Sequence, residues 1–124
     1  MLLKLDFQSA VPIYRQIRDE IVRAIAEGRL QPGERLPAIR PLAEDAGVNT
    51  MTVSKAYQLL KAEGYLATDR RSGAVVCLPG RPAGLNAQQL GQLRLLAAEA
   101  RLSGMSCEDF TAVCRQLYHE TEGQ

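Results

Sequence analysis

The sequence is poor in the residues on which catalysis and metal binding usually depend. Its 124 residues include no tryptophan, three cysteines and a single histidine, His119, and aromatic residues make up only 5% of the chain. It has no serine–histidine–aspartate set, carboxylate pair or phosphate-binding glycine loop, so little acid–base capacity remains. So few aromatic side chains also argue against the stacking platforms that bind single-stranded nucleic acids. We therefore expect neither an enzyme nor a bound cofactor.

The three cysteines, Cys77, Cys107 and Cys114, do not form a Cys-x-x-Cys pair. We expect no metal site and interpret them as buried or half-buried small apolar residues. Long hydrophobic runs are also missing, since no segment approaches the roughly 20 apolar residues that span a bilayer. Lys4 and Asp6 interrupt the apolar start, which therefore does not resemble a signal peptide. These absences predict a soluble cytoplasmic protein without a membrane partner.

The residues that are present suffice for one compact domain, or for a small domain with an appendage. Apolar residues make up 46% of the chain, enough for a hydrophobic core, and the 23% of charged residues argues against disorder. The formal net charge is only +1. Any attraction to a polyanion must therefore come from a local group of cations rather than from the whole molecule.

The start of the chain predicts a strand and a helix. Residues 2–7 alternate loosely, as in a short edge strand. Isoleucines at every fourth position then predict a helix that begins at Pro12 and ends at Gly28, with Tyr14 in the core. Proline and glycine predict a turn at residues 31–34.

Two further helices follow with almost no spare residues. The second begins near residues 38–39, because Pro41 is tolerated only within a first turn, and it ends at Gly47. The third begins at Thr50, which we interpret as its N-cap, and ends at Glu63. Its apolar face predicts core residues: Val53, Ala56, Tyr57 and Leu60. Its opposite face predicts an open surface: Met51, Ser54, Lys55, Gln58 and Lys61.

A hairpin and a linker complete this part of the chain. Short strands at residues 65–68 and 74–78 flank a basic tip at residues 69–73. The order of short helix, tight turn, second helix and basic hairpin suits a winged helix-turn-helix. We place this domain at residues 1–79 and a linker, dense in proline and glycine, at residues 80–84.

Residues 85–124 predict two helices that are divided at Gly104. A segment this short rarely holds a core of its own, so its apolar stripes need another surface. They could dock on the preceding domain, but a second copy of the chain is the partner that we expect. The residues expected in this dimer interface are Leu90, Leu93, Leu96, Ala97, Ala100, Phe110, Val113 and Leu117.

Spaced motifs over roughly residues 7–78 resemble the GntR family of bacterial transcriptional regulators. They are Pro12-Ile13-Tyr14-x-Gln16-Ile17, Gly33-Glu34-Arg35-Leu36-Pro37, Arg40-x-Leu42-Ala43, Gly47-Val48-Asn49-x-x-Thr52-Val53-x-Lys55-Ala56-Tyr57 and Glu63-Gly64-Tyr65-Leu66. The resemblance implies a mainly α fold with a small β-hairpin (α+β), a winged helix-turn-helix followed by a short helical dimerisation tail. That tail is similar to the YtrA-like subfamily, in which small C-terminal helices mediate dimerisation.

The resemblance also implies which residues contact DNA. Arg40 matches an arginine that typically contacts DNA, and Gly73 matches a wing-tip glycine that lets the backbone approach the minor groove. The turn and the start of the recognition helix match at Asn49, Thr50, Met51, Thr52 and Ser54. By their chemistry, Lys55 and the pair Arg70 and Arg71 are expected to reach base edges or phosphates.

Four positions depart from the family pattern. Ala38 stands where a capping serine is common, so the second helix is expected to have a weaker cap. Pro41 replaces a more usual acidic residue. Thr50 and Met51 stand where many relatives have arginine and asparagine or threonine. The loss of that charged donor means that the base preference of relatives does not transfer to this chain.

These observations predict a sequence-specific regulator of transcription, expected to be a repressor, that binds duplex DNA as a homodimer. Its operator would have two-fold symmetry, with half-sites about one helical turn apart. The alternative is a winged-helix module that docks proteins through the third helix and does not bind DNA. The sequence identifies no effector pocket.

Overall fold

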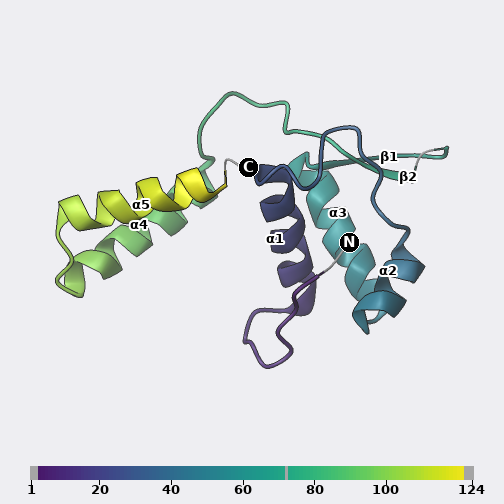
Figure 1. The fold of residues 1–124 in the computed structure, drawn as a ribbon, viewed down its shortest axis with the longest axis horizontal. Coiled ribbons are helices and arrows are strands. Elements are labelled where there is room, and N and C mark those ends of the chain that lie inside the picture. The colour runs from purple at the N-terminus through teal and green to yellow at the C-terminus, as the bar shows by residue number, and fades with distance from the viewer. Residues whose placement is uncertain (1–2, 72, 122–124) are drawn as a thin grey trace. The chain divides into compact units, whose positions relative to one another are not determined.

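The computed structural model describes residues 3–71 and 73–121 (Figure 1). The chain divides into two compact units between Gly80 and Arg81. The first unit contains α1 (Ile13–Ala26), α2 (Ile39–Ala46), α3 (Thr50–Glu63), β1 (Leu66–Asp69) and β2 (Gly73–Val76). The second contains α4 (Ala87–Leu102) and α5 (Cys107–Glu120). The predicted α+β class, a winged helix-turn-helix followed by C-terminal helices, is confirmed.

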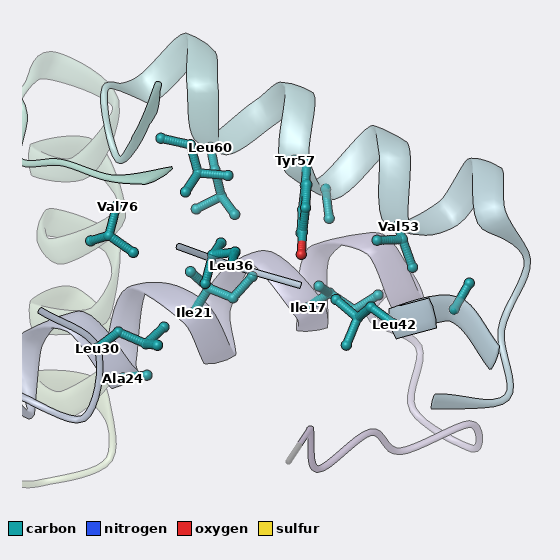
Figure 2. Packing of buried hydrophobic residues seen from close by; sticks show 13 residues of the cluster. Ile17, Ile21, Ala24, Leu30, Leu36, Leu42, Val53, Tyr57, Leu60 and Val76 are labelled. Atoms are coloured by element: carbon teal, nitrogen blue, oxygen red, sulfur yellow. The ribbon is translucent and has the colours of Figure 1, made fainter. Parts of the chain in front are cut away.

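The core of the first unit lies mainly between α1 and α3. Ile17 and Ile21 of α1 and Leu60 of α3 are completely buried, and Figure 2 shows them facing one another. Leu42 of α2 and Val76 of β2 close the two ends of this cluster. Figure 1 shows α3 between α1 and α2, and α3 packs against both helices. The predicted core residues of α3 are all buried: Val53, Ala56, Tyr57 and Leu60.

The helix boundaries follow from local chemistry. Pro12 precedes α1, where its missing N–H costs nothing. Ala38 precedes α2 without any side-chain cap, as expected, and Pro41 lies in the first turn. Thr50 is not the N-cap of α3, and that prediction is wrong. Asn49 is, since its side chain accepts a hydrogen bond of 2.7 Å from the backbone N–H of Met51.

The hairpin is extended by a third segment that the sequence did not predict. β1 and β2 pair antiparallel, each within a residue or two of the predicted strands. On the other side of β2, the backbone of residues 33–36 forms three hydrogen bonds of 2.8 Å, to Ala74 and Val76. The predicted turn at residues 31–34 therefore leads into a strand-like segment that fixes the base of the hairpin.

Three smaller expectations are wrong. Residues 3–6 form no strand, and Leu2 lies outside the described residues. The side-chain amide of Gln16 instead holds this segment against α1, because it accepts from the N–H of Asp6 and donates to its carbonyl oxygen. Cys107 and Cys114 are exposed rather than buried, and only Cys77 is half-buried.

Both helices of the second unit begin with well-formed caps. Asn86 and Gln89 form a reciprocal capping box at the start of α4. Ser106 caps α5, whose first turn is acidic and complements the helix dipole. Gly104, with φ +91°, turns the chain between them. No residue of either helix is buried within the described chain. That these helices need another surface to pack against remains a prediction.

Gly64 ends α3 in the left-handed region, with φ +92°, and an added Cβ would lie 3.1 Å from the Cα of Pro79. Gly33 has nearly the same φ, +90°, but an added Cβ would meet nothing within 4 Å. A side chain in this region costs about 1–2 kcal/mol. We expect Gly64→Ala to reduce the free energy of unfolding by more than Gly33→Ala, because only in Gly64→Ala must a neighbouring residue, Pro79, also shift slightly to make room for the methyl group. Thermal denaturation measures both, and equal losses would contradict the close contact.

Candidate nucleic-acid interface

The face of α3 that is not in the core is open within its own unit. Met51, in the first turn, is 77% exposed although it is apolar. Lys55, Gln58 and Lys61 continue the exposed face along the helix, and Ser54 is half-buried beside them. A single exposed apolar side chain is normal on a protein surface, but Met51 shares this face with a row of polar and basic side chains that the core leaves uncovered. This surface, which we call the α3 face, is therefore a candidate binding surface.

The start of α3 has a fixed position relative to α2. Gly47, with φ +70°, ends α2 in the left-handed region and allows the tight turn between the helices. Asn49 then caps α3 through its side chain, so its amide oxygen is occupied. Thr50 is exposed and Thr52 is half-buried in the same first turn. The predicted residues of the turn and the helix start thus lie together, with Asn49 in a positioning role.

Tyr14 borders the α3 face instead of lying wholly in the core as the sequence predicted. It is half-buried on α1, and the ammonium group of Lys55 lies 4.1 Å from the centre of its ring. Such cation–π contacts stabilise a defined position of the cation. The two residues line a surface hollow of about 530 Å³ with Met51, Thr52, Ser54 and Gln58.

A groove separates the α3 face from the hairpin. Ser54, Gln58 and Lys61 line one side of it, and Thr68 and Gly73 line the other. Its volume is about 410 Å³, and its floor is mostly apolar: Leu36, Pro37, Ala38, Ile39, Tyr57 and Ala74. A helix and a β-hairpin therefore present two polar edges with a shallow channel between them.

Tyr57 joins the floor of this groove to the start of α2. Its hydroxyl donates a hydrogen bond of 2.7 Å to the carbonyl oxygen of Pro37. Burial raises the pKa of Tyr57 to about 12, so the phenol remains protonated and able to donate even at alkaline pH. The bond therefore holds α3 and the segment before α2 together.

The basic side chains of the first unit fall into two groups. One group is paired with carboxylates and belongs to α1 and the loop after it: Arg15, Arg18, Arg23 and Arg29. The other group forms no side-chain hydrogen bond or ion pair with any residue in 3–71 or 73–121: Lys4, Arg35, Arg40, Lys55, Lys61, Arg70 and Arg71. Apart from Lys4, the unpaired cations lie on α2, α3 and the hairpin with its added segment. A chain of nearly neutral net charge thus concentrates its available positive charge around the α3 face.

The tip of the hairpin carries Arg70 and Arg71, both exposed. The backbone N–H of Arg71 donates to the carboxylate of Asp69 at 2.6 Å, which tightens the turn. Gly73 has φ +70° at the start of β2, and Ser72 lies outside the described residues. The structure therefore places the predicted tip residues together at one end of the hairpin.

The second unit exposes the apolar side chains that were predicted to mediate dimerisation. In α4 and α5, Leu90, Leu93, Leu96, Val113 and Leu117 are all 39–57% exposed. Three residues between the helices, Ala97, Ala100 and Phe110, are half-buried and line a hollow of about 370 Å³. The two predicted stripes thus meet each other over only part of their area.

Sequence reasoning missed a second apolar stripe on α4. Its members recur at spacings of three and four residues and are all exposed: Ala87, Gly91, Leu95, Ala98 and Leu102. Leu95 is 62% exposed and Leu102 is 87% exposed. Because α4 is apolar on two sides, no single face stands out in its sequence, which is why the second stripe was overlooked. The helix is suited to lie between two partners.

The described residues offer neither a metal site nor a membrane-spanning helix. Within residues 3–71 and 73–121, no group of three or more histidine, cysteine, aspartate or glutamate side chains could hold a metal ion. In the same part of the chain, none of the helices combines the length and the apolar character needed to cross a membrane.

Comparisons with known proteins agree on one family. Residues 13–76 match the family described as bacterial regulatory proteins, gntR family. The HTH-type transcriptional repressor YtrA of Bacillus subtilis is 28% identical over 98% of this chain and 96% of its own length.

Solved structures match both the first unit and the whole chain. YtrA from Sulfolobus acidocaldarius, described as a GntR-family transcription factor, is 37% identical over 94% of this chain and 97% of its own, with a TM-score of 0.57. A structure from Listeria monocytogenes, described as a transcriptional antiterminator, is 28% identical over 100% of this chain and 95% of its own, with a TM-score of 0.78. The DNA-binding domain of AraR, solved in complex with operator ORX1, is 29% identical over 60% of this chain and 96% of its own, with a TM-score of 0.55.

Proposed function

Because the chain belongs to the gntR family of bacterial regulatory proteins, we propose that it represses transcription by binding, as a homodimer, to a two-fold symmetric operator in duplex DNA. Family members are regulators of transcription and not enzymes. The observation that carries the proposal is the α3 face, which is open, polar apart from Met51, and surrounded by cations that form no ion pair with the residues that the structure describes.

The geometry suggests a division of roles among the DNA-facing residues. Met51 at the start of α3 would enter the major groove and contact a thymine methyl group, with Ser54 and Lys55 reaching base edges or backbone. Thr50 and Thr52 would donate to phosphates. Unpaired cations need no bond broken before they bind a phosphate, which favours phosphate contacts by Arg40, Arg70 and Arg71. Gly73 would allow the wing to approach the minor groove closely.

The same arrangement disfavours the protein-docking alternative. Docking surfaces usually have an apolar centre and few charged residues. The α3 face has one large apolar side chain, Met51, and its surroundings are basic. A phosphate backbone complements such a surface better than a protein does. The AraR domain, which aligns with the first unit, was solved on operator DNA.

We propose that residues 1–79 form the DNA-binding domain, residues 80–84 the linker and residues 85–124 the dimerisation region. The division between compact units at Gly80 and Arg81 supports these boundaries. Residues 122–124 lie outside the described residues. The exposed stripes of α4 and α5 support association with a second copy, because a two-helix unit without a buried residue lacks a core of its own.

The repressor role rests on the relatives named as repressors, including YtrA of Bacillus subtilis. Two linked half-site binders would read half-sites about one helical turn apart. Linking also makes the second binding event effectively intramolecular, which raises the affinity for a full operator far above that for one half-site.

The proposal is tested by measuring affinity for the DNA upstream of the protein's own reading frame and for a random duplex of equal length. We expect Met51→Ala and Ser54→Ala to reduce the ratio of the two affinities by about tenfold, since a base contact contributes about 1–3 kcal/mol to discrimination. Arg40→Ala should instead weaken binding to both duplexes and reduce the slope of log affinity against log salt by about one unit.

The outcomes separate the alternatives. Equal losses on specific and random DNA in the Met51 and Ser54 variants would exclude base readout by these residues. An unchanged salt slope in Arg40→Ala would remove Arg40 from the interface. A wild-type protein that shifts neither duplex would contradict DNA binding and support the docking alternative.

A further inference from the structure

Arg35 occupies an unusual position beside the hairpin. Its segment, residues 33–36, is hydrogen-bonded to β2, and Arg35 itself lies opposite Val75 in an antiparallel bridge. The backbone at Arg35 is therefore fixed to the wing on its inner side. The side chain is exposed, and its Nε lies 4.0 Å from the position that a Cβ on Gly73 would occupy. The base of the Arg35 side chain is thus rigidly placed, and its guanidinium group lies next to the start of β2.

The guanidinium of Arg35 has no partner among the described residues. Acidic groups nearby are engaged elsewhere: Glu34 accepts from the backbone N–H of Gln31, and Asp69 accepts from the N–H of Arg71. Arg29, which lines a hollow with Arg35, is paired with Glu27. Five donors of one guanidinium therefore remain available in a fixed place.

Arg35 also lines the groove between the α3 face and the hairpin. Ser54, Gln58 and Lys61 line the opposite side of this groove. In the proposed complex, the DNA strand that runs between the start of α3 and the wing lies along this groove. A phosphate that crosses it would meet a positive charge from the wing side at Arg35 and another from the helix side at Lys61.

We propose that Arg35 is an additional DNA-contacting residue, which donates to a backbone phosphate where the strand crosses the groove between α3 and the wing. This proposal rests on the proposed DNA binding. The ligand group is a phosphate because the planar fork of arginine matches phosphate oxygens, and because Arg35 lies on the hairpin side of the groove, across from the helix that is proposed to contact base edges. The contact is therefore independent of base sequence.

The test measures the salt dependence of binding to a random-sequence duplex. In Arg35→Ala, we expect the slope of log affinity against log salt to fall by about 0.9, as for the loss of one phosphate contact. Arg35→Lys should retain most of the slope, because it keeps the charge. Arg29→Ala is the matched control, because Arg29 lines a hollow together with Arg35. It should leave the slope unchanged, because Arg29 is already paired with Glu27.

A second measurement locates the contact. Phosphates of the operator duplex, on which the protein would bind in a fixed register, are replaced one at a time by uncharged methylphosphonate. One position should weaken binding of the wild type and have no further effect on Arg35→Ala, because the same contact is already lost. Arg35→Gln, which removes the charge but keeps the Cβ and Cγ methylene groups and a polar end, serves if Arg35→Ala lowers the melting temperature.

The outcomes distinguish this proposal from the proposed function. Failure of the wild type to bind any duplex would overturn both. If the wild type binds and both neutral variants keep its salt slope, DNA binding stands and the Arg35 contact is wrong. A loss that depends on the base composition of the duplex would overturn the phosphate contact in favour of base readout.

Discussion

Leu95→Glu is expected to separate the proposed dimer into monomers and to weaken operator binding by about 100- to 10,000-fold, the range by which linked sites exceed single ones. Leu95 lies in the middle of the second apolar stripe of α4 and is 62% exposed in the single chain. A carboxylate there would have to be desolvated on association without a partner. The DNA-binding unit itself would be unaffected, since the two units are separately compact.

Gln92→Glu is the matched control, because it introduces the same charge on the polar side of the same helix. Sedimentation velocity gives the oligomeric state, and a mobility-shift assay gives the affinity for a full operator and for a half-site. We expect half-site affinity to be equal in wild type and Leu95→Glu. A dimeric Leu95→Glu protein would show that this stripe is not the interface, and deletion of residues 85–124 would then test the tail as a whole.

The second large effect concerns stability. We expect Leu60→Ala to lower the free energy of unfolding by about 2–5 kcal/mol, the range for removing a buried leucine side chain. Leu60 is completely buried where α3 faces Ile21 of α1. Small domains are stable by only about 5–15 kcal/mol, so this loss is a large fraction of the total. Each kcal/mol lowers the melting temperature of a domain of this size by about 4–8 °C.

Leu78→Ala is the control, since Leu78 is 61% exposed and its truncation removes little buried area. Chemical denaturation followed by circular dichroism measures both variants. A loss below about 1 kcal/mol in Leu60→Ala would show that the site repacks without a cavity, contrary to the usual cost of truncating a buried leucine.

Local rules were sufficient where a single residue type dictates the backbone. Pro41 located the start of α2, and Gly47 and Gly64 located the ends of α2 and α3, because proline and glycine restrict what their neighbours can do. The two faces of α3 followed from helical periodicity. The family resemblance and the order of elements then identified the fold.

Features that depend on contacts far apart in the sequence were not predictable. Residues 33–36 pair with β2 about 40 positions later, and nothing in their own composition indicates a strand. Arg35 was overlooked as a DNA contact for this reason. The choice of Asn49 over Thr50 as N-cap depends on the backbone conformation, because both residue types cap well. Helical periodicity places Tyr14 in the core, but it cannot show that the Tyr14 ring also borders Lys55.

The hydroxyl of Tyr57 has a consequence for regulation. Its hydrogen bond to Pro37 couples α3 to the segment that leads into Arg40, so the reading helix and its flanking cation keep a constant offset. A DNA-binding unit that is held together in this way is regulated by moving the whole unit as a rigid body. In the proposed dimer, a signal would alter transcription by changing the distance or angle between the two DNA-binding units. Their spacing would then no longer match the helical repeat of DNA, although the structure within each unit stays the same.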